Sequence, residues 1–222
     1  MNTLKKFGLC TAAAVMLSGA PSLAATVVFD DFNGTTQTAV DVAYPGSSSS
    51  NSVSFGAGER TLTADNVTNN GVEIAATQLS VTEGKLAFSN NEGATGSGTL
   101  SYSNVGDIAT VANPFFLFDV GFFDGVANFI ATVTDTNGGT STFSELLQPG
   151  FSPKLFFSQF TGTADFNIVD VLSFSIDTTG LREGVDGSLD SISISAVPLP
   201  AGGLLLLAGL GGLAALRRKK SA

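Results

Sequence analysis

The acidic side chains are the residues of this sequence that are best suited to bind a metal ion or to take part in catalysis. Asp30 and Asp31 end an apolar segment near the start of the chain, and Asp186 and Asp190 open another near its end. Carboxylate oxygens are the ligands that Ca²⁺ prefers, and pairing of the two segments as strands would bring the four residues together. The sequence therefore offers a structural calcium site as its one cofactor, against the simpler interpretation that solvated acids keep the protein soluble.

Hydrolysis of a glycan would need only two well-placed carboxylates, but nothing marks one pair. The candidates are Glu59, Glu73, Glu83, Glu92 and Glu145. Ser152-Pro153-Lys154 does not have the pattern of a Ser/Lys nucleophile. We therefore expect a protein that is not an enzyme, with a glycoside hydrolase as the alternative.

Two residue types exclude much of the remaining chemistry. The chain has no His, which excludes imidazole-based triads, His-ligated zinc and His-ligated haem. Its single Cys, Cys10, lies in a leader segment, so the mature protein is expected to carry no thiol and no disulfide.

The charge distribution divides the chain into an acidic body and two basic ends. All 19 acidic residues lie between positions 30 and 190, where the only basic residues are Arg60, Lys85, Lys154 and Arg182. Nineteen acids against four bases give this body a net charge of −15. So acidic a surface repels nucleic acid and anionic lipid, and we expect no nucleic-acid partner.

The N-terminal 24 residues have the features of a signal peptide. Lys5 and Lys6 precede the apolar residues 7–17, and Ser22 and Ala24 place small residues where a signal peptidase reads them. We expect signal peptidase to cut after Ala24.

The C-terminal residues 197–222 have the features of a membrane anchor. Residues 197–216 carry no charge, and the basic cluster Arg217, Arg218, Lys219 and Lys220 follows. About 20 apolar residues match the roughly 30 Å of bilayer hydrocarbon, and the basic cluster should stay in the cytoplasm. A transmembrane helix over 202–216 would therefore leave the acidic body outside, and a plain anchor is one interpretation.

The same tail resembles a known sorting signal. Val197, Pro198, Leu199, Pro200 and Ala201, followed by the Gly/Leu-rich run and the basic cluster, resemble the VPLPA variant of the PEP-CTERM signal. The resemblance implies that an exosortase, a membrane cysteine transpeptidase, recognises the tail and cuts near the motif. It also implies transient anchoring in the inner membrane of a Gram-negative bacterium, then delivery to the cell surface or extracellular matrix.

Residues 25–196 alternate apolar and polar side chains with a period of two, which predicts antiparallel strands. We predict an all-β fold, an antiparallel β-sandwich of the jelly-roll kind with about ten to twelve strands. The expected strands cover residues 26–30, 59–64, 71–81, 85–90, 98–103, 127–135, 171–176 and 189–196.

Glycine pairs and a serine run indicate the connections between these strands. Turns are expected at Asn33-Gly34, Asn70-Gly71, Glu83-Gly84, Asn137-Gly138 and Asp186-Gly187, and residues 47–54 are expected to form a flexible loop. The core is expected to be rich in phenylalanine, namely Phe115, Phe116, Phe118, Phe122, Phe123, Phe156, Phe157 and Phe160.

The body also resembles the jelly-roll ectodomains that precede such tails, which are similar to carbohydrate-binding modules. That resemblance implies sugar binding by an exposed aromatic ring, which would be Tyr44, Tyr102 or an exposed Phe. We expect an exported, non-catalytic surface or matrix protein with a structural or adhesive role in exopolysaccharide or biofilm. A lectin-like module and a glycan hydrolase are the alternatives.

Overall fold

The computed structural model describes residues 26–42, 47–72, 75–150 and 154–197, and these form two antiparallel sheets. Sheet A contains β1 (Thr26–Asp30), β2 (Gln37–Asp41), β5 (Thr77–Thr82), β6 (Lys85–Asn90), β8 (Pro114–Phe123), β11 (Lys154–Phe156) and β14 (Asp186–Ala196). Sheet B contains β3 (Ser49–Phe55), β4 (Gly58–Thr68), β7 (Thr95–Gly106), β9 (Ala127–Asp135), β10 (Thr140–Leu147), β12 (Thr161–Gly162) and β13 (Val169–Asp177). One short 3₁₀ helix, η1 (Phe157–Gln159), follows β11.

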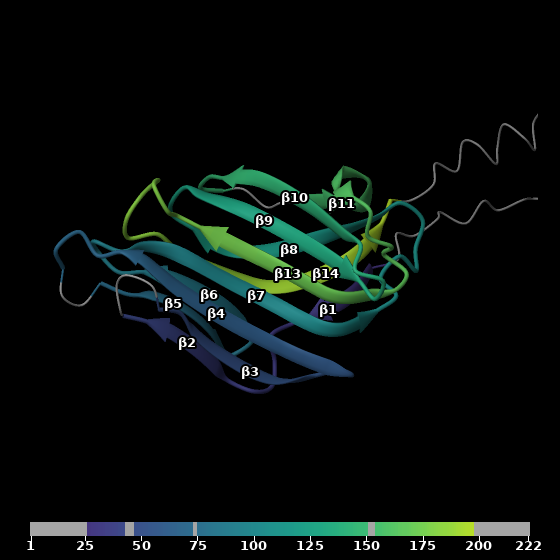
Figure 1. Ribbon diagram of the computed structural model, residues 1–222, viewed down its shortest axis with the longest axis horizontal. Coiled ribbons are helices and arrows are strands. Elements are labelled where there is room, and N and C mark those ends of the chain that lie inside the picture. Colours follow the sequence, from purple (N-terminus) through teal and green to yellow (C-terminus); the bar gives the residue numbers. More distant parts are fainter. Residues whose placement is uncertain (1–25, 43–46, 73–74, 151–153, 198–222) are drawn as a thin grey trace, which may run out of the picture. The chain divides into compact units, whose positions relative to one another are not determined.

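The strand order of each sheet departs from the order along the chain. Sheet A runs β11-β8-β14-β6-β5-β2, with β1 also pairing with β14, and sheet B runs β12-β10-β9-β13-β7-β4-β3. Figure 1 shows β9, β13, β7 and β4 side by side in one layer, with β8, β14 and β6 in the layer behind. The predicted all-β sandwich is confirmed.

The period-two pattern of the sequence explains the burial of the strands. In β4 the side chains of Arg60, Leu62 and Ala64 point into the sandwich, whereas Thr61 and Thr63 alternate with them on the outer face. Because alternate residues of a strand face opposite sides, each strand with this pattern contributes one apolar face to the core. The predicted strands 26–30, 85–90 and 127–135 have the observed bounds.

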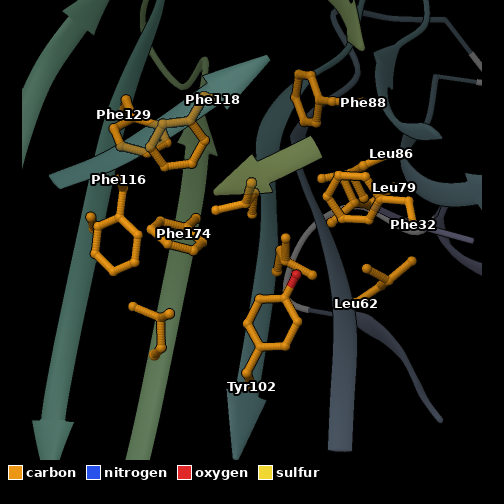
Figure 2. Close-up of a cluster of buried hydrophobic side chains, with 14 of the residues drawn as sticks. Phe32, Leu62, Leu79, Leu86, Phe88, Tyr102, Phe116, Phe118, Phe129 and Phe174 are labelled. Atoms are coloured by element: carbon orange, nitrogen blue, oxygen red, sulfur yellow. The ribbon is translucent and has the colours of Figure 1, made fainter. Parts of the chain in front are cut away.

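Phenylalanine rings form one half of the core, as Figure 2 shows. Phe118 packs edge to face against Phe129 and Phe174, with ring centroids 5.5 and 5.1 Å apart, and Phe116 packs edge to face against Phe174 at 5.3 Å. Edge-to-face contacts add about 0.5–1.5 kcal/mol per pair beyond the area they bury. Of the phenylalanines expected in the core, Phe116 and Phe118 are buried in it and Phe123, Phe157 and Phe160 pack against it, whereas Phe129 and Phe174 were not among those expected.

Three of the phenylalanines expected in the core lie outside it. Phe115, Phe122 and Phe156 are absent from the buried cluster and from the half-buried side chains that pack against it. Phe115 alternates with the buried Phe116, and Phe156 follows the buried Leu155, so both rings point outward. An uninterrupted run of apolar residues conceals this alternation in the sequence, and β8 was not among the expected strands.

Two expected connections are strands instead. Residues 49–54 of the predicted serine loop belong to β3, where the hydroxyls of Ser50 and Ser52 bond those of Thr63 and Thr61 at 2.9 and 2.7 Å. The predicted turn at Asp186-Gly187 begins β14, and Gly187 pairs with Phe123. A side chain on Gly187 would meet the Phe123 ring 2.8 Å away, so this glycine provides close packing between strands.

The segment 71–76 of another predicted strand lies outside β5, which begins at Thr77. The turn predicted at Glu83-Gly84 is confirmed, because both residues have positive φ, 53° and 75°, between β5 and β6. That conformation is typical of a two-residue hairpin turn with Gly in its second position.

The described strands belong to one compact unit, Ala24–Val197. Every strand pairing and the whole buried cluster of the described residues lie within it, so it contains what it needs to fold on its own. The described ranges contain no helix long and apolar enough to cross a membrane. The predicted span 202–216 and the predicted signal peptide lie outside these ranges.

Candidate functional site

The first and last strands pair, as the calcium site would require, but Asp30 points inward. β1 pairs with β14 so that Thr26 lies opposite Ser195 and Asp30 opposite Ile192. Inside the sandwich the Arg60 guanidinium donates to both oxygens of Asp30, at 3.1 and 2.9 Å, and both side chains are 2% exposed. Asp30 is therefore occupied by a buried ion pair.

Tyr102 and Gln37 complete this buried network. The Tyr102 hydroxyl donates to Asp30 Oδ2 at 2.7 Å, and the Arg60 Nε donates to Gln37 Oε1 at 2.6 Å. Burial, and then the neighbouring Asp30 charge, raise the pKa of Tyr102 well above its usual value, which keeps the phenol protonated. Tyr102 is 1% exposed, so its ring cannot stack on a sugar, and Tyr44 lies outside the described residues.

The other three calcium candidates lie apart from Asp30. Asp31 is exposed and accepts the Asn33 backbone N–H at 3.1 Å, and hydrogen bonds from Asn33 lower its pKa. Asp190 forms an ion pair with Lys85 at 3.3 Å. Asp186 opens β14, and its backbone N–H bonds the Asp124 carboxylate at 2.8 Å. Within the described part of the chain, no three acidic side chains form a group that could hold a metal ion.

Asp135 organises the turn between β9 and β10. Its Oδ1 accepts the backbone N–H groups of Asn137 and Gly139, at 2.8 and 2.9 Å, and its Oδ2 accepts that of Asp165 at 2.8 Å. These bonds, with that from Asp165 the largest, lower the pKa of the Asp135 carboxyl. Backbone donors therefore occupy both oxygens of Asp135 and fix the turn.

The acids considered for glycan hydrolysis are dispersed. Glu59 lies on β4, Glu83 in the β5–β6 turn and Glu145 on β10, all exposed, and Glu73 lies outside the described residues. Glu92 lines a polar hollow of about 450 Å³ together with Glu183 and Asp186. Neither Glu183 nor Asp186 was among the acids considered for hydrolysis. Both are about 90 residues from Glu92 along the chain, so the sequence gives no signal that the three line one hollow.

Phe115 and Phe156 form an aromatic strip on the outer face of sheet A. The rings of Phe115 and Phe156 contact each other with centroids 5.1 Å apart at an interplanar angle of 44°. Phe122 is 53% exposed and lies opposite Ser188 of β14, but it lines the space between the two sheets and does not belong to this strip.

Polar side chains flank the aromatic strip. Leu117 and Asp119 follow Phe115 on β8, opposite Ser193 and Ser191 of β14, and Lys154 lies opposite Leu117 on β11. Cross-strand neighbours of this kind share one face of a sheet. This face therefore combines half-buried aromatic rings with hydroxyl, carboxylate and ammonium groups.

The outer face of sheet B carries a row of hydroxyl groups, unlike that of sheet A. In its middle row the register aligns hydroxyls across Ser52, Thr61, Ser101, Ser173, Thr132 and Thr142. Its exposed large apolar side chains are Ile130 and Leu146. Among the described residues, exposed aromatic rings outside the core are thus a property of sheet A.

The sorting motif is described only at its first residue. Val197 follows β14 directly and is 40% exposed. The remaining motif residues Pro198, Leu199, Pro200 and Ala201, the basic cluster Arg217, Arg218, Lys219 and Lys220, and the cleavage residue Ala24 lie outside the described residues.

Comparison with known proteins identifies no family. No family model matches the chain, and no curated protein matches it. Solved structures with a similar fold include the family 11 carbohydrate-binding module of the cellulosomal cellulase Lic26A-Cel5E of Clostridium thermocellum, at 14% identity and TM-score 0.40, covering 77% of this chain and 94% of that one. A mutant of a family 29 carbohydrate-binding module has 14% identity and TM-score 0.35, covering 78% and 92%.

An agarase has 11% identity and TM-score 0.41, and the match covers 60% of this chain. This chain spans about a quarter of the agarase's length, 24%. These similarities concern the fold.

Proposed function

We propose that this protein is an exported, non-catalytic adhesive protein of the cell surface or extracellular matrix. It binds extracellular polysaccharide through the aromatic strip on the outer face of sheet A. The observation that supports this proposal is the position of Phe115 and Phe156 on the outer face, outside the core cluster. Exposed aromatic rings are costly to leave in water, and they gain free energy when the apolar face of a sugar covers them.

The polar groups beside the strip support a sugar ligand over an apolar protein partner. Lys154 lies two residues before Phe156, and Asp119 lies four residues after Phe115 with Ser191 opposite it, so donors and acceptors are available along the same strands. Small-ligand sites combine an apolar surface with a few polar groups that fix orientation. The acidic body makes a neutral polysaccharide a better ligand than an anionic one.

Delivery to the outside is the other part of the proposal, and it rests on the tail. Exosortase would read the Val197–Ala201 motif after signal peptidase had removed the leader, with the inner membrane as a transient anchor. The body would then remain in contact with the exopolysaccharide that it binds.

The test is polysaccharide binding by the full chain in lipid nanodiscs, on a glycan array and on matrix polysaccharide from the host. The double variant Phe115→Ala/Phe156→Ala should weaken binding about tenfold or more, because it removes two rings from the contact. The matched control is Ile130→Ala/Leu146→Ala, which truncates exposed apolar side chains on sheet B and should leave binding unchanged. Absence of binding to any glycan, or release of shortened sugars during incubation, would refute the proposal.

A further inference from the structure

A cavity of about 70 Å³ lies between the two sheets. Its walls include Leu79, Phe88, Leu100, Phe118 and Phe174, and Figure 2 shows Phe118, Phe129 and Phe174 on one side of the core and Phe88, Leu79 and Leu86 on the other. Ser188 contributes the one polar side chain among the described residues that line it. A buried water needs two to four polar partners, so this cavity suits an apolar group.

Exposure of the lining residues increases toward one end of the cavity. Leu79, Leu100 and Ile192 are at most 2% exposed, whereas Val120, Phe123 and Leu189 are half-buried and Phe122 is 53% exposed. The half-buried and exposed residues just named belong to β8 and β14. The cavity therefore opens on the β8–β14 side.

An irregularity in strand pairing lies at the same end. The register of β14 against β8 shifts between Ser188 and Leu189 and again between Leu189 and Ser191. A bulge leaves part of the ladder unpaired and bends the strand, and bulges are frequent beside binding sites. Two independent features, exposure and register, thus place the mouth at these residues.

Acidic residues are the chain neighbours of the mouth residues: Asp119 precedes Val120, Asp124 follows Phe123 and Asp190 follows Leu189. Asp119 and Asp124 are exposed on β8 and just after it, and Asp190 lies on β14 with Lys85 as its partner. Three carboxylates against one ammonium repel an anionic head group and favour a neutral or cationic one. Screening by salt should reduce this preference.

The volume limits the shape of the guest. An engineered apolar cavity of about 150 Å³ accepts benzene, and this cavity has less than half that volume. We propose that it binds the alkyl end of a neutral or cationic amphiphile, which enters at the β8–β14 bulge and keeps its head group among Asp119, Asp124 and Asp190. This cavity lies between the sheets, whereas the aromatic strip lies on the outer face of sheet A, and its ligand is of another class; Asp119 borders both sites.

The test is methyl-group nuclear magnetic resonance on the unit Ala24–Val197, with 1-butanol, 1-hexanol, hexylamine, hexanoate and 1,6-hexanediol as probes. 1-Hexanol and hexylamine should shift the methyl signals of Leu79, Leu100 and Ile192. The signals of Leu62 and Val133, which do not line the cavity, should stay unchanged. Each added methylene should tighten binding about fourfold. Hexanoate should bind several-fold more weakly than hexylamine at low salt. Equal shifts with 1,6-hexanediol, or equal affinity for hexanoate and hexylamine, would overturn the proposal.

A pair of matched variants tests the position of the mouth. Val120→Phe places a ring at the mouth and should weaken 1-hexanol binding at least tenfold. Val105→Phe makes the same change at a half-buried valine of β7 that packs against the core outside the cavity, and it should leave the affinity unchanged. Equal effects of the two variants would show that binding does not occur at this cavity.

Discussion

Arg60 is the central residue of the buried polar network in the core. Its guanidinium donates to Asp30 and Gln37, lies 5.9 Å from the ring centres of Phe32 and Phe55, and is as buried as an aliphatic core side chain. Desolvation makes a buried ion pair a weak contributor to stability as a pair, but loss of one partner leaves an uncompensated charge. The network therefore makes the position of β1 and β4 specific.

Arg60→Met should lower the free energy of unfolding by about 3–5 kcal/mol, because Asp30 and Gln37 lose their partner in the core. Lys85→Met is the matched control, since it breaks the exposed pair with Asp190 and should cost about 1 kcal/mol or less. Urea unfolding followed by circular dichroism measures both. Similar losses from the two variants would mean that the Arg60 network does not behave as a buried one.

At the scale of elements, the β9–β10 hairpin depends on one carboxylate. Because folding lowers the pKa of Asp135 below the usual 3.8, its stabilising effect is present above that pH and is lost as the pH falls through the folded value. Asp135→Asn should therefore reduce the dependence of unfolding free energy on pH between about pH 4 and pH 2. Urea unfolding at a series of pH values measures this, with the exposed Asp119→Asn as control. An unchanged slope in Asp135→Asn would contradict the assignment.

The sequence predicted those elements whose burial alternates cleanly. β1, β6 and β9 have the expected bounds, and Glu83-Gly84 forms the expected turn, because period and turn chemistry are local properties. β8 was missed because its aromatic residues occupy both faces, so Phe115 and Phe116 look alike in sequence. β3 was missed because Ser50 and Ser52 form a strand through hydroxyl contacts with β4, which no local pattern contains.

The candidate sites, like the strands, could be predicted from the sequence only where their signal is local. Sequence reasoning admitted an exposed Phe as a sugar platform but could not say which phenylalanine, since that depends on which residues of β8 face the core. It predicted the approach of the first and last strands, yet placed Asp30 in a calcium site because the Arg60 partner is 30 residues away. The apolar cavity depends on register shifts between strands far apart in sequence and has no local signal.

At the scale of the whole molecule, the folded body ends immediately before the predicted processing site. β1 begins at Thr26, two residues after the predicted signal peptidase cut, and β14 ends at Ala196, one residue before the sorting motif. Thr26 also pairs with Ser195, and their hydroxyls bond at 2.8 Å, so both ends of the body belong to one pair of strands. Cleavage within residues 197–201 would therefore remove no strand residue.

We expect the protein from its native host to have an intact mass that begins near Ala25 and ends within or just before Val197–Ala201, in the surface or medium fraction. Because β14 is complete at that point, the processed form should unfold at the same urea concentration as the body of the unprocessed chain. Deletion of the exosortase gene provides the control and should leave a species that retains Arg217–Lys220 in the inner membrane. If that longer species is also the one found in the unmodified host, the tail is a plain anchor, and the polysaccharide contact occurs at the membrane.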